Sequence, residues 1–337
     1  LNTASAACTF IGGGDRNIAC GTNSSVVGGT LNTASAACSF IGGGENNKVI
    51  SISPSIIGGG SNNIIDGSGR AFIGGGNTNT ISGYYYNVIV GGSDNKNIGY
   101  NSFIGSGQYN TISGYCSSIV GGTLNTASAA CSFIGGGCDN HSACILSFIG
   151  GGDLNENKGF KSVIVGGQAN CITNSCTSIV GGCTNVNNAS LSFIGGGREN
   201  CLTLNSSCSN IVGGYDHYIN NACSSIVGGF RNCINRPVMS GTSLSFIGGG
   251  CLNKITGSFS FIGGGVNNSI TDTDNAMCPM SSIIGGGCSN EICAHRSGIL
   301  GGGCNIIASG DNHSFIVGSN IISHAVCTTH VNNLTVS

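Results

Sequence analysis

Charged residues are scarce in this chain. Lys and Arg together number 11 and Asp and Glu 13 among 337 residues, for a net charge of -2; Trp is absent and Pro occurs only 3 times. Phosphate backbones are bound by clustered Lys and Arg, so this composition argues against a nucleic-acid partner. No apolar run approaches the roughly 20 residues of a membrane helix, so we expect no membrane insertion.

Glycine is abundant instead, with 61 residues, and the hydrophobic fraction of 39% with little charge is not that of a disordered chain. Much of the glycine belongs to one phrase, Ser-x-Ile-x-Gly-Gly-x-x-Asn, which recurs in 20 copies. Of the 19 spacings between successive Ile positions, 12 equal 15 residues, three equal 16, and the others are 17, 21, 22 and 17. A repeat this regular decides the fold class.

Each copy contains two short apolar segments separated by turn residues, and the equivalent residues of successive copies form two apolar columns. The repeat Ile alternates with its neighbours, which predicts a strand with the Ile facing inward, and a second apolar column follows two residues after the Asn. A helix is disfavoured because each Gly would cost about 1 kcal/mol relative to Ala. The sequence therefore predicts an all-β, parallel β-solenoid of about 20 coils of 15–16 residues over residues 1–322.

The two ends and the longer spacings carry further expectations. Leu1 enters in mid-repeat, so we expect a piece of a longer polypeptide, with residues 323–337 as an exit segment toward another domain. Extra residues are predicted between the second apolar column and the next Ser-x-Ile, as in Asn235–Met239 and Thr271–Asn275. Such bulges are typical of binding loops on solenoids, and tolerated surface drift is the alternative.

The Asn of the phrase is present in 18 of 20 copies, with His217 and Ile322 as the exceptions. Stacked Asn side chains can hydrogen-bond from coil to coil, and Asn tolerates turn conformations, so we interpret the column as structural. A row of sugar-binding amides is the alternative. The predicted Asn ladder includes Asn47, Asn63, Asn79, Asn95, Asn110 and Asn125.

Ten of the 13 Phe stand just before the repeat Ile. Where Phe is there, the residue after the Ile is Gly in all but Phe315, and where Ser is there the residue after is Val, so bulk is traded between two positions on one strand face. Close packing limits volume in this way and water does not. We therefore predict that this face meets other copies of the chain, most simply three. The predicted interface comprises Phe10, Phe40, Phe72, Phe103, Phe133, Phe148, Phe193, Phe246 and Phe261.

At these residues the chain resembles the head repeats of trimeric autotransporter adhesins and the related shafts of phage and large-virus fibres, whose coils read Ser-apolar-x-Ile-Gly. The matching runs are Ser39-Phe40-Ile41 with Gly43, and Ser132-Phe133-Ile134 with Gly136. The resemblance covers nearly all the chain and implies a left-handed, homotrimeric β-roll used for attachment. The second Gly, the Asn and the Cys content depart from that family, so no specific ligand carries over.

The 20 Cys follow the repeat, and several lie three residues before the Ile. Cys116 would lie over Cys131 in the next coil, and Cys208 over Cys223, at a separation that a disulfide accepts. Inter-coil bridges in an oxidising setting and half-buried free thiols both fit this spacing. The segment His324-x-x-Cys327-x-x-His330 lacks a fourth ligand, so we assign no metal site.

The function expected from these patterns is structural. Only 13 Asp and Glu are present and they form no aligned cluster, so we expect no enzyme, no catalytic residue and no cofactor. The leading hypothesis is a trimeric fibre or adhesin segment, extracellular on a virion or microbial surface, with itself as partner and a host-surface receptor or glycan as candidate ligand. The alternative is a filament that grows by end-to-end strand pairing.

Overall fold

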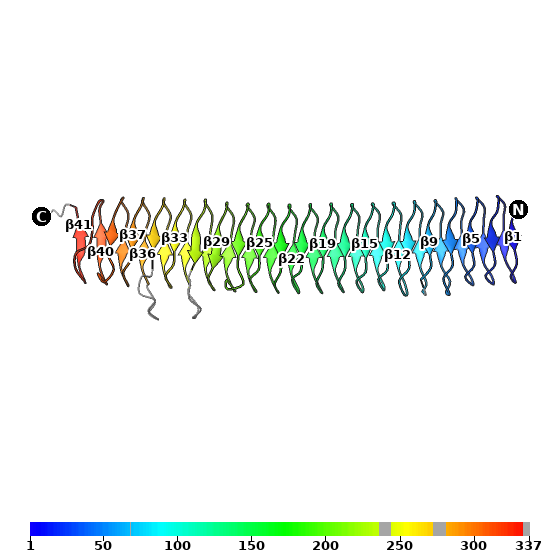
Figure 1. Ribbon diagram of the computed structural model, residues 1–337, viewed down its shortest axis with the longest axis horizontal. Helices are drawn as coiled ribbons and strands as arrows, with labels where there is room; N and C mark the ends of the chain where they lie inside the picture. Colours follow the sequence, from blue (N-terminus) through cyan, green and yellow to red (C-terminus); the bar gives the residue numbers. More distant parts are fainter. Residues whose placement is uncertain (68, 236–243, 272–280, 333–337) are drawn as a thin grey trace. The chain divides into compact units, whose positions relative to one another are not determined.

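Very short strands make up the regular structure of this protein. The computed structural model describes residues 1–67, 69–235, 244–271 and 281–332, and no helix occurs among these residues. The chain divides into two units, Leu1–Gln168 and Ala169–Ser337. Within each unit the coils follow one another in chain order, and each coil contributes one strand to each of two sheets (Figure 1).

In the first unit, sheet A carries the second apolar column and sheet B carries the repeat Ile. The strands of sheet A are β1 (Thr3–Ala4), β3 (Ile18–Ala19), β5 (Thr33–Ala34), β7 (Lys48–Val49), β9 (Ile64–Ile65), β11 (Thr80–Ile81), β13 (Lys96–Asn97), β15 (Thr111–Ile112), β17 (Thr126–Ala127), β19 (His141–Ser142) and β21 (Glu156–Asn157). The strands of sheet B are β2 (Phe10–Ile11), β4 (Ser25–Val26), β6 (Phe40–Ile41), β8 (Ile56–Ile57), β10 (Phe72–Ile73), β12 (Val88–Ile89), β14 (Phe103–Ile104), β16 (Ser118–Ile119), β18 (Phe133–Ile134), β20 (Phe148–Ile149) and β22 (Val163–Ile164).

The second unit repeats the arrangement. Its sheet A strands are β23 (Cys171–Ile172), β25 (Val186–Asn187), β27 (Cys201–Leu202), β29 (Tyr218–Asn220), β31 (Cys233–Asn235), β33 (Lys254–Ile255), β35 (Ser269–Ile270), β37 (Glu291–Ile292) and β39 (Ile306–Ile307). Its sheet B strands are β24 (Ser178–Ile179), β26 (Phe193–Ile194), β28 (Asn210–Ile211), β30 (Ser225–Ile226), β32 (Phe246–Ile247), β34 (Phe261–Ile262), β36 (Ile283–Ile284), β38 (Gly298–Ile299), β40 (Phe315–Val317) and β41 (Thr329–Val331).

Each strand pairs in parallel with its counterpart one repeat away. Phe133 is level with Phe148 and Ile134 with Ile149, and the amide of Phe133 donates to the carbonyl of Ser147 at 3.0 Å. The same register recurs through both sheets of each unit, which confirms the predicted all-β parallel solenoid. β41 pairs with β40 in the same manner, so strand pairing in the second unit runs past residue 322 into the predicted exit segment.

The core of a coil is narrow and is filled by two columns of aliphatic side chains. Ile73 of sheet B and Ile81 of sheet A are both 0% exposed, as are their counterparts in neighbouring coils. Full burial of such a side chain contributes about 1.5–3 kcal/mol. In sheet A four coils have a buried polar residue at this position instead: Asn97, Ser142, Asn157 and Asn187. The solenoid is thus stabilised coil by coil rather than by one central core.

The two corners of a coil are built differently. At the corner from sheet B to sheet A, the second Gly of the phrase has a left-handed backbone, as at Gly137 with φ 88°, and a Cβ there would meet the carbonyl oxygen of Gly152. The first Gly of the phrase is different: a Cβ at Gly136 would meet nothing within 4 Å. Only the second Gly is required by the fold of the chain itself.

The corner from sheet A to sheet B accepts the extra residues, as the spacings predict. Five residues lie between Ala34 and Phe40, whereas six lie between Val49 and Ile56 in a 16-residue coil. Of the predicted bulges Asn235–Met239 and Thr271–Asn275, only the first residue of each is described, and the rest lie outside the described residues.

Candidate interaction surface

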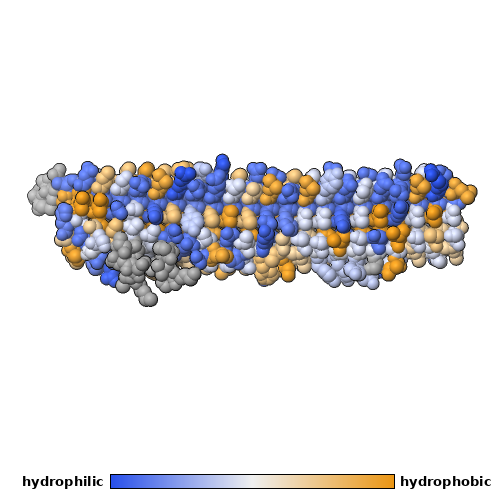
Figure 2. Space-filling view, in the orientation of Figure 1, coloured by the Kyte–Doolittle hydropathy of each residue, from blue (hydrophilic) through white to orange (hydrophobic). Residues whose placement is uncertain are grey.

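The outer face of sheet B presents the predicted interface residues as a row with one large apolar side chain per coil. Phe10 is 55% exposed, and Phe40, Phe72, Phe103, Phe148, Phe193 and Phe261 are 36–40% exposed, while Phe133 and Phe246 are half-buried. Where a coil has Ser in this position, the exposed apolar side chain is the Val two residues later, as Val120 and Val180 show. We call this row of Phe, Val, Ile and Leu side chains the apolar stripe. Apolar patches are also visible among polar side chains on the face seen in Figure 2.

The pairing of Phe before the repeat Ile with Gly after it has a cause within the chain. The ring of Phe103 lies over Gly105 of the same strand, and a Cβ on that glycine would be 3.4 Å from the ring carbon Cε1 and would meet the carbonyl oxygen of Val120. The same contact recurs at Phe193 and Gly195. Volume on this face is therefore limited by each strand's own packing, and the exchange by itself is not evidence of a partner.

Neighbouring rings also stack along the stripe where two Phe coils adjoin. The rings of Phe133 and Phe148 have centroids 5.0 Å apart and planes 5° from parallel, and those of Phe246 and Phe261 are 5.4 Å apart at 7°. This stacking explains why Phe133 and Phe246 are the less exposed members. The stripe is a pre-ordered surface because its rings are held by neighbours in the same chain.

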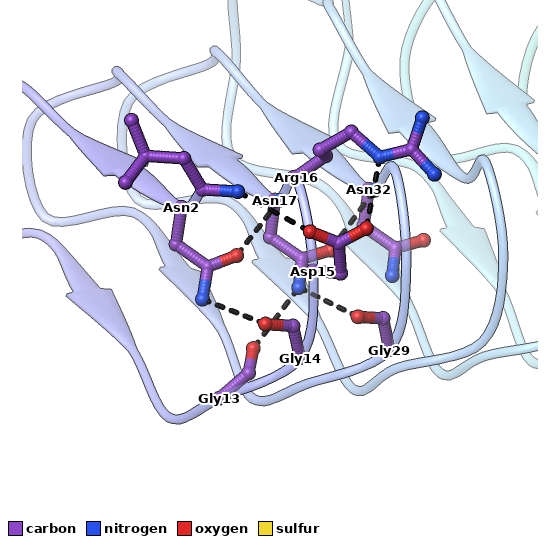
Figure 3. A network of polar contacts seen from close by, with 9 residues as sticks. Asn2, Gly13, Gly14, Asp15, Arg16, Asn17, Gly29 and Asn32 are labelled. Atoms are coloured by element: carbon purple, nitrogen blue, oxygen red, sulfur yellow. Dashed lines mark hydrogen bonds and ion pairs between the residues drawn. The ribbon is translucent and has the colours of Figure 1, made fainter.

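The Asn side chains of successive coils lie one above another and are fully buried. In the first coils, Asn17 donates its Nδ2 hydrogens to the carbonyls of Gly13 at 3.0 Å and Gly29 at 2.8 Å, and its Oδ1 accepts from the amide of Asn32 at 3.0 Å (Figure 3). The six predicted ladder residues repeat this set of bonds, and amide-to-amide bonds of 3.1 Å are present at Asn47, Asn63, Asn95 and Asn110. With every amide group engaged inside the coil, the column presents no free donor to a sugar.

His217 takes the place of Asn in one coil. Its Nδ1 accepts from the amide of Asn232 at 3.1 Å, so the proton is on Nε2, and that buried nitrogen makes no hydrogen bond of standard geometry. Burial lowers the pKa of His217, against the opposing effects of its bond to the Asn232 backbone, of the negative charge of Asp216 and of the Gly229 backbone. The coil thus holds a neutral imidazole, which makes only some of the hydrogen bonds that an Asn would make at this position.

A second buried polar column was missed by the sequence analysis although its residue opens the repeat phrase. The Ser two positions before the repeat Ile is buried, and Ser117 Oγ donates to the carbonyl of Ala129 at 2.8 Å. Ser132 Oγ donates in turn to Ser117 Oγ at 3.1 Å. The recurrence of Ser at this position was the available signal, since a small residue with a hydroxyl closes the corner opposite the Asn column in most coils.

The paired cysteines lie at equal positions of adjacent coils. Cys116 and Cys131 both adopt left-handed backbone conformations, with φ 52° and 54°, at the corner from sheet A to sheet B, and Cys208 and Cys223 do the same. Burial raises the pKa of the Cys223 thiol, and the neighbouring Cys208 side chain raises it further. All four are free thiols in this structure, and a bridged form of either pair stays a prediction.

The sequence analysis also missed a hollow on the outer surface of the first unit, with a volume of about 370 Å³. It lies where three successive 16-residue coils present the same three positions side by side. The signal that could have found it is the run of three 16-residue spacings, the only such run in the chain. The hollow is lined by Cys38, Pro54, Ser55, Ile56, Arg70, Ala71, Phe72, Tyr86, Asn87 and Val88.

Comparison of the chain with protein-family models and with curated proteins found no match to either. Across the described ranges, no helix is long and apolar enough to cross a membrane. In the same ranges, no three His, Cys, Asp or Glu side chains gather in a way that could hold a metal ion.

Proposed function

We propose that this chain is a structural, non-enzymatic segment of a surface fibre, in which copies of the chain associate, most simply as a trimer, through the apolar stripe. The single observation that carries the proposal is the contrast between the two outer faces. Outward positions of sheet A include Lys48, Lys96 and Glu156, whereas the positions on either side of the repeat Ile in sheet B hold no charged residue in any coil.

In a lone solenoid both outer faces would contact water. Selection for solubility alone would then give no reason to exclude charged residues from one face and not from the other. An apolar row that continues through every coil of a unit exceeds the scattered apolar side chains that monomers normally expose. Its regular spacing suits a partner with the same repeat, which a second copy of the chain has by construction. Attachment at a virion or microbial surface is a role that suits a long repetitive segment of this kind.

The energy available to the assembly follows from the exposed fractions. Phe103 is 39% exposed, so more than half of its surface is already covered by its own chain. Covering the remainder contributes about 1 kcal/mol per ring, half or less of the value for a fully exposed Phe. Several rings in one unit nevertheless sum to a stable association because the stripe is pre-ordered.

The experiment is to measure solution mass by light scattering, for the wild type and for a variant with Phe103→Ser, Phe133→Ser and Phe148→Ser. Ser occupies the same position in other coils, so the solenoid is expected to fold while the assembly dissociates. The matched control carries Thr111→Lys and Thr126→Lys on sheet A, where Lys also occurs in other coils, and is expected to keep the wild-type mass.

Each outcome is decisive. A wild-type mass of one chain overturns the proposal. A mass that grows without limit as concentration rises supports the filament alternative, in which end coils pair strand to strand. Loss of assembly in both variants means that the stripe is not the interface.

A further inference from the structure

We propose that the hollow at Arg70 binds a carboxylate-bearing sugar, and that the tyrosine row beside it holds the adjoining sugars of an acidic glycan. The inference deepens the proposed function by naming a ligand class for attachment, and it depends on that function for its biological setting. Its physical basis is an unpaired cation, an apolar floor and a line of exposed aromatic rings. The floor residues Ile56, Phe72 and Val88 belong to the apolar stripe, so the proposal requires that copies of the chain leave this stretch of the stripe uncovered.

Equivalent residues of three successive coils form the rim and the floor of the hollow. Pro54, Arg70 and Tyr86 occupy one position of three successive coils and form its rim, and the outward side chains of β8, β10 and β12 form its floor. On that floor Ile56 is 42% and Phe72 38% exposed. A ligand placed here would contact aliphatic and aromatic surface below and polar groups at one edge only.

Arg70 is the only cationic group among the lining residues. Its Nη1 donates to the hydroxyl of Tyr86 at 3.1 Å, and its guanidinium carbon lies 6.0 Å from the centre of the Tyr86 ring. No carboxylate among the described residues forms an ion pair with it, so four of its five N–H donors are available to a ligand. A planar guanidinium held by an aromatic ring suits two-point recognition of a carboxylate.

The polar groups beneath the rim are already used by the chain. Asn87 donates to the carbonyls of Tyr84 at 2.5 Å and Gly99 at 2.8 Å, and its Oδ1 accepts from the amide of Ser102 at 3.0 Å. Ser55 donates to a neighbouring carbonyl at 3.1 Å and accepts from an amide at 3.2 Å. Recognition therefore falls to Arg70 and the apolar surfaces, which excludes a ligand that needs many hydrogen bonds from the floor.

Aromatic rings continue from the hollow along the same corner. The ring of Tyr85 lies 6.2 Å from Tyr86 and 6.0 Å from Tyr100, and Tyr100 stacks on Tyr115 at 4.5 Å with planes 15° apart. Tyr85 is 46% and Tyr115 55% exposed. Pyranose rings have an apolar C–H face that packs on exposed aromatic rings, so a linear saccharide fits this row while one acidic unit reaches Arg70.

A nucleic acid would also stack on aromatic rings, but it needs a track of cations for its phosphates. The corner offers Arg70 alone among the residues that line the hollow or form the tyrosine row. One unpaired cation next to a long aromatic surface matches a ligand with sparse charge. The acidic saccharide is for this reason the occupant that the surface favours.

The test is isothermal titration of the full chain, in its solution assembly, with galacturonic acid, galactose and tetragalacturonate. We expect galacturonic acid to bind at least tenfold more tightly than galactose, and Arg70→Gln to remove that difference. The matched control is Arg231→Gln, since Arg231 also lies over an aromatic ring, at 5.1 Å, but is paired with Asp216 at 2.9 Å. We expect this control to bind as the wild type does.

A second variant separates the row from the hollow. Tyr115→Ala is expected to weaken tetragalacturonate several-fold and to leave galacturonic acid unchanged. Equal binding of galacturonic acid and galactose, or retained binding in Arg70→Gln, overturns the proposal. Preference for benzoate over galacturonic acid overturns the sugar assignment. Light scattering on the same samples reports the assembly separately, so a failure of this site and a failure of the proposed fibre are distinguishable.

Discussion

Replacing His217 with Asn should stabilise the second unit, and should do so most at acidic pH. An Asn in this place would donate its Nδ2 hydrogens to the carbonyls of Gly213 and Gly229, as the Asn of the preceding coil, Asn200, does to Gly196 at 2.9 Å and Gly214 at 3.1 Å. It would also remove the unpartnered Nε2–H of the imidazole. Leaving a buried donor unsatisfied costs about 1–3 kcal/mol, and we expect a gain of that size at pH 8.

The pH dependence follows from the lowered pKa of His217. Between the usual value of 6.5 and the lower pKa of the folded state, the unfolded chain binds a proton that the folded chain does not. Stability is therefore lost as pH falls below 6.5, at up to about 1.4 kcal/mol per pH unit. H217N lacks this group, so its advantage over the wild type should grow as pH falls below 6.5.

The assay is urea unfolding followed by circular dichroism at pH 8 and pH 5.5, with amide exchange of Asn232 as a local readout because its N–H bonds to His217. Every other titrating group is common to both proteins, so the difference between them isolates the imidazole. Asn200→His is the matched control and should be destabilised by a similar amount. Equal urea midpoints for wild type and H217N at both pH values would refute the reasoning.

Two further results are expected. Gly137→Ala should destabilise the first unit by about 1–3 kcal/mol, because of its left-handed φ of 88° and the carbonyl that the Cβ would meet, whereas Gly136→Ala should stay within about 0.5 kcal/mol in thermal unfolding; equal effects would contradict the assignment of the two glycines. Under oxidised glutathione, the wild type should lose the two thiols of Cys208 and Cys223 in a thiol titration, and Cys208→Ser should block that loss; unchanged thiol counts would leave the pair reduced and the bridge wrong.

The repeat made the coil architecture predictable, because a period-2 apolar pattern and a fixed spacing leave few ways to stack strands. The different roles of the two glycines were not predictable. Both are Gly in nearly all copies, yet Gly137 has a left-handed backbone with a carbonyl against it and Gly136 has open space. The sequence shows only that Gly recurs at both positions. The backbone conformation at each position determines whether the fold of the chain requires Gly there.

At the Phe positions the sequence predicted a packing constraint but not the residue that imposes it. The exchange of bulk between Phe103 and Gly105 was correctly read as a packing constraint, but the partner in that packing is the glycine of the same strand. Two residues on one strand face can exclude each other without any second chain. Support for the apolar stripe as an interface comes instead from its exposure and from the lack of charged residues on either side of the repeat Ile, where outward positions of sheet A do carry charge.

The hollow could not be found from the phrase because it exists only as a relation among coils. Pro54, Arg70 and Tyr86 are unremarkable one at a time, and they become a rim because three successive coils each carry one extra residue at the same corner. In a solenoid each coil contacts mainly its neighbours, so a local insertion changes local stability and leaves distant coils intact. A regular array of this kind can therefore carry one irregular surface at small cost, and the irregular coils are where a ligand site should be sought first.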